Sequence, residues 1–233
     1  MIRGLYSAAG GMLATSHQQD VAAQNLAHAS KPGYRRELLR FEAGGSAEDF
    51  SGPSVSLRTD QSPGGYEQTG NPLEVAIGGS GLFVIESPNG AQYSRSGVFQ
   101  LNGDGQLVTP EGFPVQGLAG AITLPAGAAS IEIVGDGTVL ADGLEVDQLR
   151  IVEFSDSSKL QRIGSSSFAA PKGVEPTNVD QPEIRQGVRE MSNTTAVQEM
   201  VQMTTGLRQF EATQRALRSI GDAIALTTRP TGR

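Results

Sequence analysis

The stretch MSNTTAVQEMVQMTTGLRQFEATQRALRSIGDAIAL, residues 191–226, carries a heptad pattern of apolar side chains. Four side chains recur every seven residues: Met203, Phe210, Leu217 and Ile224. A second heptad position is filled twice and then lapses, in the order Met200, Leu207, Gln214 and Gly221. This spacing places one apolar seam along an α-helix.

Signals at both ends of this stretch fit a helix. Thr195 with Gln198 forms a capping box at the start, and Pro230 provides a stop at the end. The helix is weak by itself, because Thr204 to Gly206 are poor helix formers and glycine costs about 1 kcal/mol against alanine. The seam therefore needs a partner, which is either this chain's own core or other helices.

The other end of the chain predicts a second helix, from Ile2 to about Ala29. Its apolar stripe includes Leu5 and Met12 and resumes near Leu26, and the segment is rich in alanine. The sequence Lys31-Pro32-Gly33 ends the helix. We expect the two terminal helices to pack side by side as a coiled coil, to bring the termini together and to become ordered only on assembly.

Between the helices the sequence predicts short strands and tight turns. Leu82 to Glu86 is an apolar run, and Asn89-Gly90 is the strongest of the hairpin signals. The predicted class is α+β, with long N- and C-terminal helices around a central antiparallel all-β domain. The predicted ranges are an N-terminal assembly helix (1–33), an extended arm or loop (34–68), the β-domain (69–188) and a C-terminal assembly helix (189–233).

Composition excludes several classes of protein. The net charge is −7, with no basic cluster to neutralise phosphates, so we expect no nucleic-acid partner. The chain has no cysteine, which excludes disulfides, thiolate catalysis and cysteine-ligated metals. No apolar run reaches the roughly 20 residues needed to cross a bilayer. No apolar segment typical of a cleavable signal peptide follows Arg3.

The motifs that resemble chemical sites have simpler explanations. The glycine-rich segment Gly78-Gly79-Ser80-Gly81 is followed by a strand, whereas a phosphate-binding loop opens a helix. His17 and His28 are two helical turns too far apart to share a metal. Aspartates in glycine turns, such as Asp104, lack the spacing of a calcium loop. We expect no catalytic residue, cofactor, metal or small-molecule substrate, and no enzyme activity.

Several segments together form a pattern that continues in order along most of the chain. They are Ala22–Ala27, Ser30–Arg35, Thr69–Ile77, Tyr93–Asn102, Gly105–Thr109 with Gly112–Val115, Met191–Asn193, Glu199–Val201 and Arg208–Glu211. This pattern resembles the bacterial flagellar basal-body rod proteins, which are related to the hook protein. His28 and Thr194-Thr195 depart from that family's usual residues.

The resemblance implies a structural subunit of the flagellar rod, the axle that joins the export base to the hook. Its terminal helices would form the inner tube, with the β-domain outside. The implied partners are further copies of itself and other rod, hook and export-base proteins. The implied location is the flagellar basal body, reached through type III export without a cleaved signal. Proximal and distal rod types both fit, and the short β-domain favours the proximal one.

We predict an assembly interface on the two helices, consisting of Leu5, Met12, Asn25, Leu26, Met200, Met203, Leu207, Phe210, Leu217 and Ile224. One alternative is a secreted β-domain adhesion protein on a helical stalk, which would need a longer unbroken heptad pattern and a signal peptide. A carbohydrate-active enzyme would need an acid/base pair of carboxylates in a cleft.

Overall fold

The computed structural model describes residues 2–42 and 54–228 and divides the chain into two compact units. The helical unit comprises Met1–Ala27, Glu37–Asp60 and Thr194–Arg233. The β unit comprises His28–Arg36 and Gln61–Asn193. Two segments near the beginning of the chain and one at its end thus form the helical unit.

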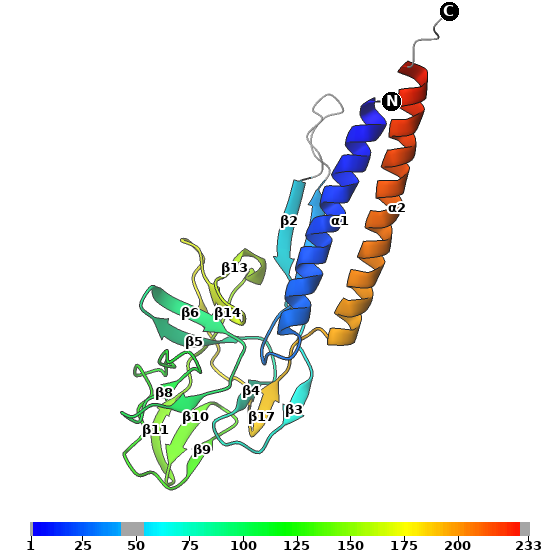
Figure 1. Cartoon of the computed structure of the whole chain (residues 1–233). Coiled ribbons are helices and arrows are strands. Elements are labelled where there is room, and N and C mark those ends of the chain that lie inside the picture. Colours follow the sequence, from blue (N-terminus) through cyan, green and yellow to red (C-terminus); the bar gives the residue numbers. More distant parts are fainter. Residues whose placement is uncertain (1, 43–53, 229–233) are drawn as a thin grey trace, which may run out of the picture. The chain divides into compact units, whose positions relative to one another are not determined.

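The helical unit contains two helices and one hairpin (Figure 1). Helix α1 spans Ile2–His28 and α2 spans Ala196–Thr228. The hairpin pairs β1, Glu37–Glu42, with β2, Ser54–Thr59, in antiparallel register. The Thr195 side chain caps α2, since its hydroxyl oxygen accepts the Gln198 backbone N–H at 3.4 Å.

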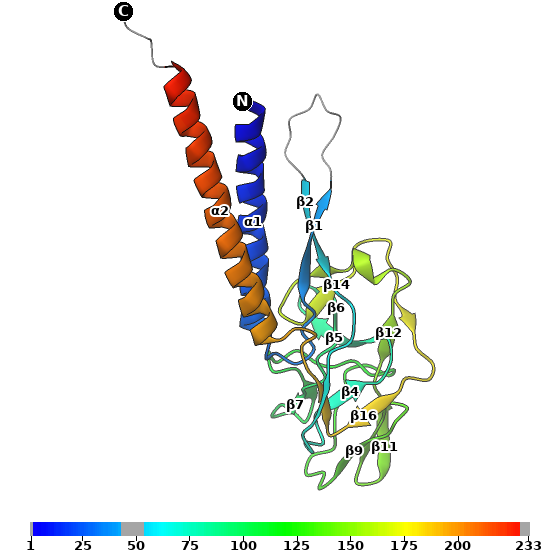
Figure 2. The same ribbon diagram turned by 90° about the vertical axis from the view of Figure 1, so that its right-hand side faces the viewer.

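The prediction of two long terminal helices packed as a coiled coil is wrong. Helix α1 is the shorter, with 27 residues against 33, and the helices diverge towards the N-terminus of α1 and the C-terminus of α2 (Figure 2). Met200 is 48% exposed and Leu207 is 51% exposed, whereas a coiled coil would bury both. The physical reason is that the polar stretch Ser16 to Asp20 interrupts the apolar stripe of α1, so α1 offers no matching heptad seam.

Gly206 marks a close approach between the two helices. This glycine is buried in α2, and a methyl group at its Cα would lie 3.3 Å from Cγ of Gln19 in α1. A small residue is therefore needed at this point of the helical unit.

We expect Gly206→Val to weaken helix packing by about 1–3 kcal/mol, because two further methyl groups overpack the contact with Gln19. Gly221→Val is the matched control, since a side chain at Gly221 meets open space. Thermal unfolding followed by circular dichroism at 222 nm compares the two variants. Equal melting temperatures for the two would contradict a close contact at Gly206.

The β unit is built from short antiparallel strands. A six-stranded sheet has the order β13-β14-β6-β5-β12-β15. Its members are β13 (Gln161–Arg162), β14 (Ser167–Ala169), β6 (Gly90–Ser94), β5 (Leu82–Ser87), β12 (Ile151–Glu153) and β15 (Thr177–Asn178). A three-stranded sheet contains β11 (Leu144–Gln148), β10 (Thr138–Ala141) and β9 (Ile131–Ile133).

Three further strand pairs and one helical turn complete the unit. The pairs are β16 (Ile184–Gln186) with β4 (Val75–Ile77), β17 (Val188–Glu190) with β3 (Tyr66–Gln68), and β7 (Gln100–Leu101) with β8 (Leu107–Val108). A 3₁₀ turn, η1, spans Ser157–Lys159. Strands from both ends of the β unit therefore pair with one another and close it.

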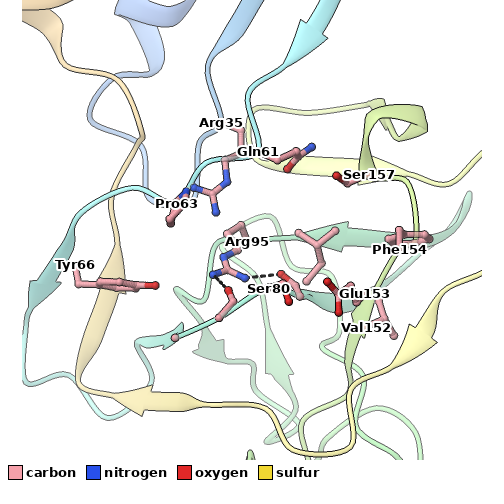
Figure 3. Close-up of a pocket in the computed structure, with 14 residues that line it drawn as sticks. Arg35, Gln61, Pro63, Tyr66, Ser80, Arg95, Val152, Glu153, Phe154 and Ser157 are labelled. Carbon is pink, nitrogen blue, oxygen red and sulfur yellow. Dashed lines mark hydrogen bonds between the residues drawn. The ribbon is translucent and has the colours of Figure 1, made fainter.

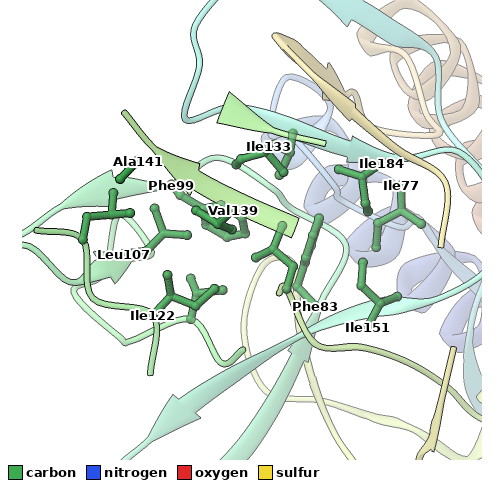
Figure 4. Close-up of a cluster of buried hydrophobic side chains, with 14 residues drawn as sticks. Ile77, Phe83, Phe99, Leu107, Ile122, Ile133, Val139, Ala141, Ile151 and Ile184 are labelled. Carbon is green, nitrogen blue, oxygen red and sulfur yellow. The ribbon is translucent and has the colours of Figure 1, made fainter. Parts of the chain in front are cut away.

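Strand β5 separates two apolar clusters, which explains its continuous apolar sequence. Phe83 and Ile85 are buried, and Phe83 packs edge-on against Phe99 with ring centroids 5.2 Å apart in the larger cluster (Figure 4). Leu82 and Val84 belong to the second cluster. A strand buried on both faces needs apolar residues at consecutive positions.

The β5–β6 hairpin turns at Pro88-Asn89, one position before the expected Asn89-Gly90 pair. Strand β5 ends at Ser87 and β6 begins at Gly90, which has a φ of 109°. Proline has the φ that the first turn position requires, and glycine accepts the positive φ that follows. The turn was thus predictable, but its register was not.

Candidate assembly surface

The residues predicted for assembly lie in different environments in the helical unit. Leu5 and Ile224 lie in α1 and α2, but their side chains are outside the described residues. The half-buried members are Met12, Leu26, Met203, Phe210 and Leu217, the exposed ones are Met200 and Leu207, and the buried one is Asn25. The structure therefore leaves part of the α2 seam open to solvent.

The first turns of α2 carry four exposed apolar side chains, which we call the α2 strip: Val197, Met200, Val201 and Leu207. Val197 is 69% exposed and Val201 is 61% exposed. A shallow hollow lies over this region, lined by Val197, Met200, Val201, Thr204, Thr205 and Arg208. Apolar side chains held this far out of a subunit's own core are typical of a protein–protein contact.

The β1–β2 hairpin presents a second apolar surface in the same unit. Leu39 pairs with Leu57, and Phe41 pairs with Val55. These four residues lie on one face, because side chains two positions apart along a strand point the same way. Leu57 is 61% exposed and Phe41 is 45% exposed. The alternation of Leu39 with Phe41 was the signal that could have identified this surface from the sequence.

Asn25 is bound to the first residue of this hairpin, Glu37, instead of projecting outward. Its side-chain amide donates to the Glu37 carbonyl at 2.9 Å, and its side-chain oxygen accepts the Glu37 N–H at 2.8 Å. Asn25 is 3% exposed. An asparagine is suited to this position because its amide provides a donor and an acceptor together.

We expect Asn25→Ala to destabilise the hairpin by about 2–4 kcal/mol, because the buried N–H and C=O of Glu37 lose their partner. Amide hydrogen exchange of residues 38–40 measures the change. Gln24→Ala is the control, since Gln24 is exposed. Unchanged protection in Asn25→Ala would show that the two hydrogen bonds do not hold the hairpin.

A buried ionic cluster in the β unit, absent from the sequence predictions, joins the segments that flank its core. Glu190 in β17 lies 2.7 Å from Nη1 of Arg35 and 2.6 Å from Nε of Arg95. The Gly64 N–H donates to the same carboxylate at 3.0 Å. We call Arg35, Arg95 and Glu190 the anchor. Burial lowers the pKa of Arg35, while Glu190 opposes this shift and Arg95 adds to it.

Arg95 also organises the glycine-rich segment considered above as a phosphate-binding loop. Its guanidinium donates to the carbonyls of Ile77 at 2.8 Å, Gly81 at 2.6 Å and Gly79. These carbonyls point at a cation, whereas a phosphate site presents N–H groups. The segment is therefore a turn bound by an arginine.

No metal site or membrane-spanning segment is visible in residues 2–42 and 54–228. In that part of the chain, no three potential metal-ligating side chains gather. None of its helices has both the length and the apolar character needed to cross a bilayer.

Comparison with known proteins identifies the family. Residues 76–141 match the D1 domain of the flagellar hook protein FlgE/F/G, and residues 185–224 match the C-terminal region of the flagellar basal body rod FlgEFG proteins. The chain is 34% identical to the flagellar basal-body rod protein FlgF of Escherichia coli K12, over 95% of each chain. It belongs to the flagellar basal-body rod family.

Relatives with two different names share this similarity. The FlgF rod protein of Salmonella typhimurium is 32% identical over 95% of each chain. The FlgG rod protein of Bacillus subtilis 168 is 30% identical, over 93% of this chain and 94% of that protein. This member of the rod family is a structural subunit of the flagellar basal body and assembles with other rod and hook components.

The matched C-terminal region of the rod family contains two features of the structure. It begins at Arg185, includes Glu190 of the anchor and continues along α2 through the exposed strip. Family membership also decides between the alternatives left open by the sequence, in favour of a rod subunit over an adhesion protein on a stalk.

Proposed function

We propose that this rod subunit polymerises through its terminal helices, with the α2 strip as a principal contact. The exposure of Val197, Met200, Val201 and Leu207 is the observation that carries this proposal. Burying apolar surface contributes about 25 cal/mol per Å², so covering the strip favours assembly. The predicted residues Leu5, Met12, Leu26, Met203, Phe210, Leu217 and Ile224 would extend the contact along both helices.

The helical unit offers two different apolar surfaces, which suits a head-to-tail contact. The α2 strip is helical, and the hairpin face of Leu39, Phe41, Val55 and Leu57 is a sheet surface. Contacts between unlike surfaces build an open helical polymer when the rotation between subunits does not close into a ring, whereas a twofold contact of like surfaces builds a closed dimer. Asn25 would contribute by fixing the hairpin in position.

The proposed partners are further copies of this chain, neighbouring rod and hook proteins, and the export base. We propose that the subunit is not an enzyme and takes no substrate or nucleic acid. The anchor would keep the β unit folded while the helical unit assembles. We retain the four predicted ranges as a proposal for the domain organisation of the chain: 1–33, 34–68, 69–188 and 189–233.

Electron microscopy of basal bodies from a strain lacking this protein tests the function. We expect the rod to stop short and the hook to be absent, and we expect the intact gene to restore both. The length of the remaining rod would also locate the subunit along the axle. Normal rods and hooks in the deletion strain would contradict a structural role in the rod.

A further inference from the structure

The β unit contains a pocket beside the anchor, with a cavity volume of about 320 Å³. Arg35, Tyr66, Ser80, Arg95, Glu153 and Ser157 are among its lining residues (Figure 3). The Arg35 and Arg95 side chains lie in the middle of the view, between Tyr66 on one side and Ser157 on the other. Every residue that lines the pocket belongs to the β unit.

The two arginines of this pocket differ in how many of their guanidinium N–H groups are hydrogen-bonded. Arg95 donates from Nε to Glu190, from Nη1 to Gly81 and from Nη2 to Ile77 and Gly79. Arg35 uses only Nη1, which donates to the Ser62 carbonyl at 2.6 Å and contacts Glu190. Within the part of the chain that the structure describes, Nε and Nη2 of Arg35 have no hydrogen-bond partner.

The charges within the anchor do not cancel. Two guanidinium groups face the single Glu190 carboxylate, which leaves one positive charge in excess. The side chains of Arg35 and Glu190 are 4% and 0% exposed, so bulk water compensates this charge poorly. An anion entering the pocket would supply the missing negative charge.

We propose that this pocket binds a carboxylate group, held by the free Nε–Nη2 edge of Arg35. That edge offers two parallel N–H donors, which match the two oxygens of a carboxylate. Glu153 also lines the pocket and is exposed, and its negative charge disfavours a doubly charged anion such as phosphate. A small organic acid and an aspartate or glutamate side chain of a neighbouring subunit both provide this group.

Nuclear magnetic resonance of the full chain tests the site, with the Arg35 Nε–H signal followed during titration with sodium acetate at constant ionic strength. We expect a saturable shift in the millimolar range and weaker binding of inorganic phosphate. In Glu153→Gln, acetate should bind about threefold more tightly, because a like charge near the site is removed. No saturable shift, tighter phosphate binding, or unchanged affinity in Glu153→Gln would each overturn the proposal.

Arg35→Lys provides a second variant. Lysine keeps the positive charge beside Glu190 but lacks the two parallel N–H donors of the guanidinium edge. Binding of acetate, followed through the signals of Ser80 and Ser157, should weaken about tenfold in this variant. Unchanged acetate binding in a folded Arg35→Lys protein would overturn the role of the Nε–Nη2 edge. Motility of the strain carrying folded Arg35→Lys then distinguishes the two sources of the carboxylate. Only a carboxylate from a neighbouring subunit makes the Nε–Nη2 edge of Arg35 necessary for swimming.

Discussion

Leu207→Asp is expected to abolish rod assembly while the β unit stays folded. Leu207 is 51% exposed on α2, so its replacement removes little packing within the subunit. In an assembled contact, the substitution loses about 1.5–3 kcal/mol of apolar burial and adds the cost of burying a charge. Each contact should therefore weaken by more than about 3 kcal/mol, which is over 100-fold in affinity.

Swimming in soft agar and the presence of hooks measure this effect in cells that produce only the variant. Gln209→Asp is the matched control, because it adds the same charge to the same helix at an exposed polar position. We expect the control strain to swim and to build hooks. Normal swimming of the Leu207→Asp strain would contradict the proposed role of the α2 strip.

Glu190→Gln is expected to lower the free energy of unfolding of the β unit by about 3–5 kcal/mol, because it leaves Arg35 and Arg95 buried without a counter-charge. The substitution preserves the size of the side chain, so lost packing does not account for the effect. Glu190 is 1% exposed, and its backbone carbonyl accepts the Gly33 N–H at 2.8 Å. The substitution therefore removes a negative charge at a point where the entering and leaving segments of the β unit meet.

Urea unfolding followed by near-ultraviolet circular dichroism measures the stability of the Glu190→Gln chain. Glu67→Gln is the control, since Glu67 forms an ion pair with Arg189 at 2.8 Å but both side chains are partly exposed. An exposed pair of this kind contributes about 0–1 kcal/mol. If both variants unfold at the same urea concentration, the anchor is not what holds the β unit together.

The ends of the helices were predictable because local signals set them. Lys31-Pro32-Gly33 stops α1, which ends at His28, and Thr195 caps α2, which begins at Ala196. The turns between short strands were likewise visible as glycine and asparagine signals. Such features depend on a few neighbouring residues, and a single sequence contains that information.

The packing of the helices and the anchor could not be predicted in this way. A heptad on α2 shows that an apolar seam exists, but only its partner decides whether the seam is buried, and α1 provides no such partner. Arg95 and Glu190 lie 95 positions apart, and no pattern in the sequence connects them. The pairing of β17 with β3 sets Glu190 opposite Tyr66, so its position beside Arg35 and Arg95 depends on tertiary structure.

The most direct test of the central claim is the accessibility of α2 in intact basal bodies. The natural chain has no cysteine, so Val201→Cys introduces a single thiol into the α2 strip. We expect a maleimide reagent to label this thiol in the purified subunit and not in isolated basal bodies. Asp104→Cys, at an exposed turn of the β unit, is the control for labelling in both samples. Equal labelling of Val201→Cys in subunit and basal body would contradict assembly through the α2 strip.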